Sequence, residues 1–66
     1  RKILQAVLGL PLKYRDVIHL FYYEEMSVKE IAEVLHRQES TVTSQLTRAR
    51  GILKKNLGEK YQFEEF

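Results

Sequence analysis

The sequence has no cysteine, one proline and three glycines in 66 residues. Without cysteine the chain cannot form a disulfide, an iron–sulfur cluster or a thiolate zinc site. So few glycine and proline residues do not suit a turn-rich β-sheet. No run approaches the roughly 18 consecutive apolar residues of a membrane-spanning helix, and Arg1 and Lys2 lead into no signal-like segment. We therefore expect a cytoplasmic protein.

Net charge is also low, but it is unevenly distributed. Eleven basic and nine acidic residues leave a net charge of +2, which alone does not indicate a polyanionic partner. Residues 37–60 carry six basic and two acidic side chains, whereas residues 1–36 carry five of each. The excess of positive charge lies in the second half of the chain, where a nucleic acid would bind.

The composition is that of a globular chain, with 44% hydrophobic and 30% charged residues. A chain of 66 residues is long enough for one small domain. Apolar residues recur with helical spacing throughout, which predicts an all-α fold. We expect a small bundle of four helices with a C-terminal helix-turn-helix in residues 1–58, followed by a C-terminal tail in residues 59–66.

Glycine and proline separate the first two predicted helices. The segment Gly9-Leu10-Pro11 ends a short apolar stripe that includes Val7 and Leu8, and proline suits the start of the next helix. The second helix is expected to end between Tyr22 and Glu25. Its apolar side has the spacing i, i+3, i+4, i+7 and consists of Tyr14, Val17, Ile18 and Phe21.

Ser27-Val28-Lys29-Glu30 has the form of a capping box, which predicts the start of a third helix. The helical pattern is interrupted at His36-Arg37-Gln38 and then resumes, so we expect a fourth helix over residues 39–57 that stops at Gly58. The residues of the fourth helix predicted to face inward are Val42, Leu46, Ala49 and Leu53.

Two helices joined by about three residues have the proportions of a helix-turn-helix. If the apolar side of the last helix is buried, its hydroxyl and guanidinium groups must face outward. Short polar side chains can reach base edges, and basic side chains can contact phosphates. The residues expected to contact DNA are Arg37, Gln38, Ser40, Thr41, Thr43, Ser44, Thr47 and Arg48.

Several of these groups have an ordinary alternative role. A polar helix face is commonly just solvated, and Arg37 and Gln38 can be exposed turn residues. Arg50 can form an ion pair with Glu33 or Asp16 instead of contacting a phosphate.

The remaining residues do not suggest catalysis or a cofactor. His19 and His36 lie on different predicted elements and lack the further ligands of a metal site. The sequence contains no nucleophile with a base and an orienting group and no phosphate-binding glycine loop. The tyrosines are spaced as the edge of a core, although Tyr22 or Tyr23 can be exposed and meet a partner protein. We expect no enzyme, no cofactor and no metal.

Several motifs occur together in the order and spacing of a known family. They are Leu10-Pro11, Tyr14-Arg15-Asp16-Val17-Ile18, Ser27-Val28-Lys29-Glu30-Ile31-Ala32, Glu39-Ser40-Thr41-Val42-Thr43-Ser44-Gln45-Leu46 and Arg48-Ala49-Arg50. From about residue 5 to 57 the chain resembles region 4 of bacterial sigma factors, of the extracytoplasmic-function type. The resemblance implies that the last helix reads the minus-35 promoter element, and that the domain docks on the flap of the RNA polymerase β subunit. An anti-sigma protein is a further candidate partner, whereas no membrane or small-molecule substrate is implied.

The sequence departs from the family pattern at four positions. The family commonly has lysine or arginine at Thr43 and arginine at Gln45, so two usual positive charges are missing. We expect weak, salt-sensitive DNA binding as a result. Glycine is frequent at His36 and serine at Gln38. Because glutamine is a poor N-cap, either the helix start is strained or the cap shifts to Ser40.

Two other functions fit the same bundle. A sigma-like factor can hold the polymerase flap or an anti-sigma protein without reading DNA, and the missing charges at Thr43 and Gln45 leave this alternative open. The effector domain of a response regulator shares the four-helix form, but residues 44–50 resemble sigma factors more than they resemble that family. Arg1 falls within an apparent running helix, so we expect a piece of a longer chain with a polymerase-binding domain upstream.

Overall fold

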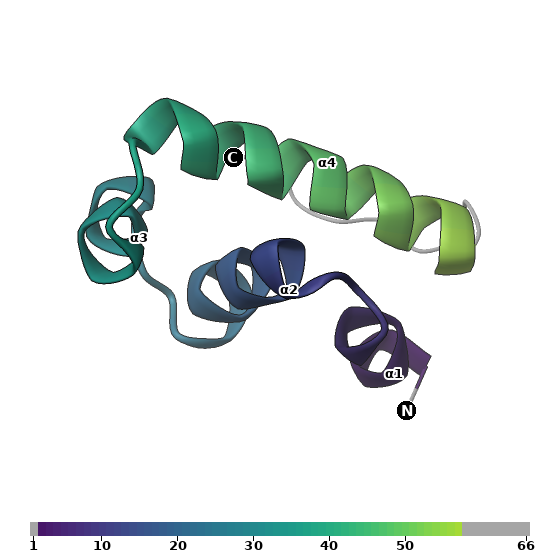
Figure 1. The fold of residues 1–66 in the computed structure, drawn as a ribbon. Coiled ribbons are helices and arrows are strands. Elements are labelled where there is room, and N and C mark those ends of the chain that lie inside the picture. Colours follow the sequence, from purple (N-terminus) through teal and green to yellow (C-terminus); the bar gives the residue numbers. More distant parts are fainter. Residues whose placement is uncertain (1, 58–66) are drawn as a thin grey trace.

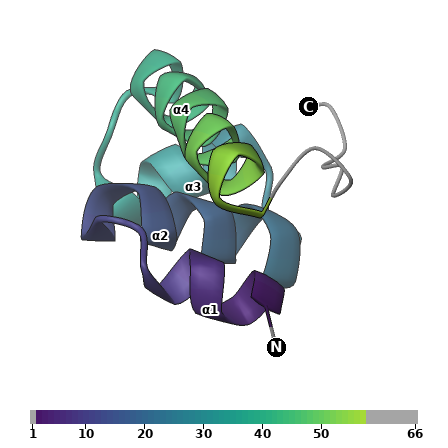
Figure 2. The ribbon, with the colours of Figure 1, turned by 90° about the vertical axis from the view of Figure 1, so that its right-hand side faces the viewer.

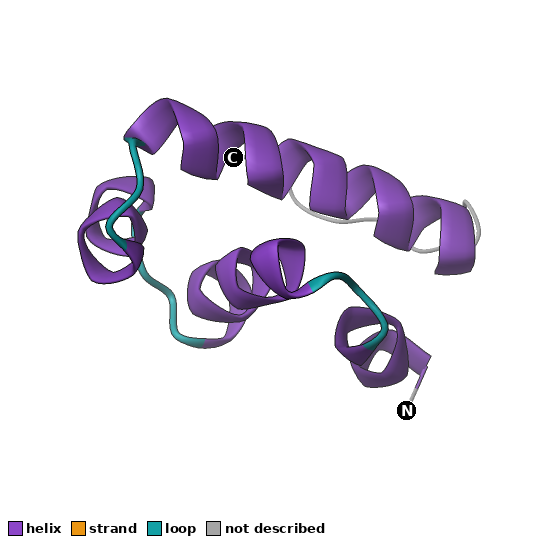
Figure 3. Ribbon diagram, in the orientation of Figure 1, coloured by secondary structure: helices purple, strands orange, loops and turns teal. Residues whose placement is uncertain are grey.

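The computed structural model describes residues 2–57, with side chains from residue 5 to 56, and all regular structure in this range is helical (Figure 3). The elements are α1 (Lys2–Leu8), α2 (Leu12–Ile18), the π-helical turn η1 (His19–Tyr23), α3 (Val28–Leu35) and α4 (Glu39–Leu57). The predicted all-α bundle is confirmed. The expected stop at Gly58 and the tail in residues 59–66 lie outside the described residues. None of the helices in residues 2–57 combines the length and hydrophobicity needed to cross a lipid bilayer.

The long helix α4 lies across the other helices (Figure 1). Figure 2, turned by 90°, shows α4 above α2 and α3, with α1 below. The four residues predicted to face inward from α4 are all fully buried, at 0% exposure. They pack against buried residues of α2 and α3, among them Val17 and Ile31. The predicted rotational phase of α4 is therefore confirmed, and burial of this apolar side holds α4 in place.

The junction between α1 and α2 is a tight turn. The Gly9 amide donates to the Gln5 carbonyl at 3.0 Å, and the Leu10 amide donates to the Val7 carbonyl at 3.1 Å. Leu10 is buried in the core. From α2, Arg15 Nη1 donates to the Leu8 carbonyl at 3.3 Å, placing a cation at the C-terminal end of α1.

The second predicted helix comprises α2 and η1 and ends at Tyr23, within the predicted region, but its last part is not α-helical. Its last turn widens into η1, where the Glu24 amide donates to the His19 carbonyl five residues back, at 3.2 Å. In this wide turn Leu20, Phe21 and Tyr22 are half-buried in succession. The apolar spacing did not indicate this change, since the residues from Tyr14 to Phe21 fit the period of an ordinary α-helix.

The predicted capping box of α3 is confirmed. The Glu30 amide donates to Ser27 Oγ at 3.1 Å, and the Ser27 amide donates to Glu30 Oε1 at 2.8 Å. Hydrogen bonds to the Glu30 carboxylate from the Ser27 amide and from the Ser27 side chain stabilise its ionised form and lower the pKa of the Glu30 carboxyl below its ordinary value. The box therefore defines where the first helix of the helix-turn-helix begins.

The turn between α3 and α4 spans His36 to Gln38, the length that the sequence predicted. His36 adopts a left-handed conformation with φ 57°, which is strained for a residue with a Cβ atom. The Arg37 amide donates to the Ala32 carbonyl at 2.9 Å and closes α3. The Val42 amide donates to the Gln38 carbonyl at 3.0 Å, and α4 begins at Glu39. The alternative in which the N-cap shifts to Ser40 is therefore wrong.

Candidate DNA-binding interface

The outward side of α4 is a continuous polar surface. The predicted contact residues on this helix are all exposed: Ser40, Thr41, Thr43, Ser44, Thr47 and Arg48. Because the opposite side is fully buried, the helix cannot rotate these side chains away without opening the core. A preformed polar face on a firmly packed helix is what base recognition in a major groove requires.

Part of this face lines an open hollow of about 310 Å³ between α2 and α4. Four of the predicted residues lie here, Ser40, Thr41, Ser44 and Arg48, together with Gln45. Lys13 and Tyr14 of α2 form the other wall. Thr43 and Thr47 lie outside the hollow, where Thr47 Oγ1 donates to the Thr43 carbonyl at 3.0 Å. The hollow and the flank of α4 are thus two parts of one exposed surface.

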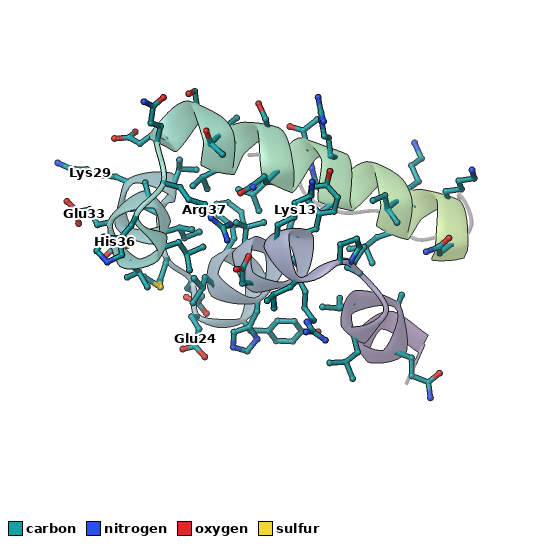
Figure 4. The ribbon with its side chains drawn as sticks, in the orientation of Figure 1. Lys13, Glu24, Lys29, Glu33, His36 and Arg37 are labelled. Carbon is teal, nitrogen blue, oxygen red and sulfur yellow. The ribbon has the colours of Figure 1, made fainter. Side chains whose placement is uncertain are left out.

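Sequence reasoning missed Lys13. The first 36 residues are electrically balanced, so nothing in their local pattern marked this lysine. Packing of α2 beneath α4 places Lys13 below the middle of α4 (Figure 4), where it lines the hollow together with Ser44 and Arg48. Its side chain also lies over the Tyr14 ring, 5.1 Å from the ring centroid. Lys13 and Arg48 therefore give the hollow two positive charges from different helices.

Arg37 differs from the other predicted contact residues because its side chain turns into the domain (Figure 4). Its Nη2 donates to Asp16 Oδ2 at 2.9 Å, and its Nη1 donates to Asp16 Oδ1 at 3.3 Å. Nη1 also donates to Gln45 Oε1 at 2.9 Å and lies 3.4 Å from the Lys13 carbonyl. The Arg37 and Asp16 side chains are 24% and 25% exposed. Arg37 thus joins the turn to both α2 and α4, while its neighbour Gln38 is exposed.

Arg50 was expected either to contact a phosphate or to form an ion pair with Glu33 or Asp16. Asp16, one of its two expected partners, forms its ion pair with Arg37. Arg50 is half-buried on α4 beside the core, so its stem contributes packing. Lys54 and Lys55 are exposed in the last turns of α4. They extend the positive charge of the helix away from the hollow.

A second surface is apolar and was not predicted. Residues of α1, α2, η1 and α3 line a groove of about 490 Å³, and none of the described side chains of α4 does. Its lining leaves four large apolar side chains substantially exposed: Leu8 at 56%, Leu12 at 66%, Tyr23 at 50% and Val34 at 55%. We call this surface the apolar groove. Exposed apolar side chains gathered in one place typically mark a protein interface.

The described residues do not assemble a metal site. No group of three or more histidine, cysteine, aspartate or glutamate residues in the described part of the chain is placed to hold an ion. His19 Nε2 lies 3.3 Å from Glu24 Oε2, and its ring stacks on Tyr23 at a centroid distance of 5.6 Å. His36 is exposed in the turn.

The helices α3 and α4 are joined by a short turn, and α4 has a buried apolar side and an exposed polar side. This arrangement defines a helix-turn-helix domain. The family model for region 4 of sigma-70 matches residues 1–53. The chain is 46% identical over 55 residues to "ECF RNA polymerase sigma factor SigW" of Bacillus subtilis, an alignment covering 83% of this chain and 29% of the relative. The chain therefore belongs to the sigma-70 region 4 family, as a domain of the extracytoplasmic-function type. No solved structure gives a significant match.

Proposed function

We propose that this chain recognises the minus-35 promoter element as part of a sigma factor that directs RNA polymerase to initiate transcription. It would act in the cytoplasm, by binding rather than by catalysis. Membership of the region 4 family supports promoter recognition and polymerase as the partner. The observation that carries the proposal is the exposed polar face of α4, since its residues lie on one side of a helix whose other side is fully buried.

In this proposal the N-terminal half of α4 enters the major groove. Ser40, Thr41 and Ser44 are short hydrogen-bonding residues and would contact base edges. Arg48 and Lys13, on the two walls of the hollow, would contact phosphates on either side of the groove. The residues outside the hollow, Gln38, Thr43 and Thr47, would follow the flanking backbone. Arg37 would act by holding the turn, because its guanidinium is already paired with Asp16.

The experiment is selection of bound duplexes from a random pool by the full chain at low salt. The proposal expects a short enriched motif, with amide resonances of residues 37–48 shifting on addition of that motif. Arg48→Ala would weaken binding to all sequences and lower the slope of log affinity against log salt by about 1. Thr43→Ala is the matched control on the flank, where no charge is lost. Absence of any enriched motif would contradict the proposal.

The apolar groove favours a second interaction through the same domain. We propose that it receives an apolar helix or loop of the β-subunit flap, because four large apolar side chains stand exposed there. No α4 side chain from residue 39 to 56 lines the groove, so DNA and polymerase can bind together. Arg15 at the groove edge adds a charge for orienting an acidic partner. An anti-sigma protein would compete for this surface.

A pull-down with the isolated flap tests this second interaction and separates it from DNA recognition. Capture of the chain by the flap, abolished by Leu12→Asp but not by Arg48→Ala, would support the groove as the docking surface. Capture by the flap together with a flat DNA selection would instead favour the alternative function, an interaction module that does not read DNA.

A further inference from the structure

The amide group of Gln45 is oriented by the domain itself. Its Oε1 accepts a hydrogen bond from Arg37 Nη1 at 2.9 Å. A guanidinium carries only donors, so the end of the amide that faces Arg37 must be the oxygen. Two further hydrogen bonds, at 2.9 and 3.3 Å, join Arg37 to the carboxylate of Asp16. Arg37 therefore cannot swing away from Gln45 without giving up its ion pair.

This orientation decides what Gln45 can offer to a ligand. The side chain is half-buried and lines the hollow with Thr41, Ser44 and Arg48. With its oxygen turned inward, the outward end is the NH2 group, which has two donors and no acceptor. An unrestrained glutamine pairs with adenine by donating to N7 and accepting from the N6 amino group. The bond to Arg37 turns the accepting half of that pair towards the domain and away from a base in the groove.

We propose that Gln45 is a specificity-determining residue that reads an acceptor edge in the major groove, either N7 and O6 of guanine or O4 of thymine. Arg37, anchored by Asp16, is the positioning residue that keeps the amide in this orientation. The inference rests on the proposed recognition of the minus-35 element and adds one base-reading residue to it. It also gives Arg37 a part in recognition without any contact to DNA.

The test is random-pool selection with the full chain and two variants, scored for base preference at each position. Gln45→Glu keeps an oxygen for Arg37 but removes both donors. At one base pair, the preference for guanine or thymine should be replaced by one for cytosine or adenine, whose amino groups can donate to the carboxylate. Affinity for the original motif should fall about 10-fold. Gln5→Glu is the matched control, because it makes the same chemical change on the exposed side of α1.

Arg37→Ala releases the Gln45 amide and tests the positioning role. Adenine should become acceptable at the same base pair, with the other positions unchanged. A residue that only stabilised the fold would weaken binding to all sequences without altering the ranking at one position. If Arg37→Ala does not fold by circular dichroism, Gln45→Glu still decides the proposal, since it retains the partner of Arg37.

The outcomes separate this inference from the proposed function. An enriched motif whose base ranking is the same for the unaltered chain and for Gln45→Glu would overturn the role of Gln45, while leaving promoter recognition intact. A changed ranking for Gln45→Glu with an unchanged ranking for a folded Arg37→Ala would overturn the positioning role of Arg37. No enrichment by the unaltered chain would overturn the proposed function and this inference with it.

Discussion

Two groups of leucines in this domain have the same chemistry and opposite surroundings. Leu46 and Leu53 on α4 are completely buried, whereas Leu8 and Leu12 beside the apolar groove are 56% and 66% exposed. The buried pair holds α4 against the bundle and so fixes the direction of its polar face. The exposed pair contributes little to folding and remains available to a partner. Hydrophobicity alone therefore does not assign a role, since position in the fold decides between stability and binding.

The two surfaces differ in the same way. The polar face of α4 is built on one long helix, and the spacing of its residues predicted it. The apolar groove is assembled from four shorter elements, and no single stretch of sequence contains it. This separation leaves the surface proposed for DNA and the surface proposed for polymerase free of shared residues. Leu8 and Leu12 can then be altered without changing a residue of the polar face, whereas Asp16 lines the groove and also holds Arg37.

The largest expected effect is a loss of stability when the buried Leu46 is truncated. Leu46→Ala should lower the free energy of unfolding by about 2–5 kcal/mol, because it leaves a cavity in a fully packed core. A domain of this size is expected to have a total stability of only about 3–5 kcal/mol. Urea denaturation followed by circular dichroism measures the change. Leu12→Ala is the matched control and should change stability by no more than about 0.5 kcal/mol; equal losses would break the comparison.

The next effect concerns binding through the apolar groove. Leu12→Asp places a charge where an apolar partner would pack, and should weaken flap binding by about 1–2 kcal/mol. The fold should be retained, since the side chain is 66% exposed. Isothermal titration with the flap measures the affinity, and the DNA motif selected by the variant should be unchanged. A loss of DNA selectivity together with flap binding would show that the two surfaces are coupled.

The sequence predicted those features that depend on neighbours along the chain. The capping box at Ser27 and the start of α4 at Glu39 follow from local hydrogen bonding and helical spacing, and both are confirmed. The inward side of α4 was also predicted residue by residue. These features have in common that their determining residues lie within one or two helical turns of one another.

Features that depend on contacts between distant segments were not predicted. The ion pair of Arg37 with Asp16, 21 residues away, was not predicted. Lys13 reaches the hollow only because α2 packs beneath α4. The π-turn at the end of α2 and the apolar groove likewise depend on packing between elements. Sequence spacing carries no information about which of several possible partners a long charged side chain will find.

Exposed residues can also stabilise the domain, and Ser27 is an example. Although Ser27 is exposed, its hydroxyl oxygen accepts a hydrogen bond from the Glu30 amide at the start of α3. Ser27→Ala should lower the free energy of unfolding by about 1 kcal/mol, since an amide of the first helical turn loses its partner. Thermal unfolding by calorimetry measures this, with Ser44→Ala as the control. Ser44 is exposed on α4 and makes no cap, so a loss of similar size there would contradict the assignment.

A smaller and opposite effect is expected at His36. Its left-handed conformation costs a residue with a Cβ atom about 1–2 kcal/mol. Glycine avoids this strain, but it loses more conformational entropy on folding, which offsets part of the gain. His36→Gly should therefore raise the free energy of unfolding by about 0.5 kcal/mol. Glu33→Gly, in the regular part of α3, should lower it by about 1 kcal/mol. Urea denaturation of the two variants should give changes of opposite sign.

The smallest effect is a pH dependence at the start of α3. Hydrogen bonds from the Ser27 amide and with the Ser27 hydroxyl lower the pKa of Glu30 in the folded state, so the unfolded chain binds protons more readily there. The resulting stability is present above the ordinary pKa of about 4.5 and is lost as the pH falls through the lowered value. Glu30→Gln should therefore flatten the pH profile of stability below about pH 4.5. Glu33→Gln, one turn further along the same helix, serves as the control. If both variants keep the profile of the unaltered chain, the carboxylate of the capping box does not contribute to it, and acid unfolding of this domain must begin elsewhere.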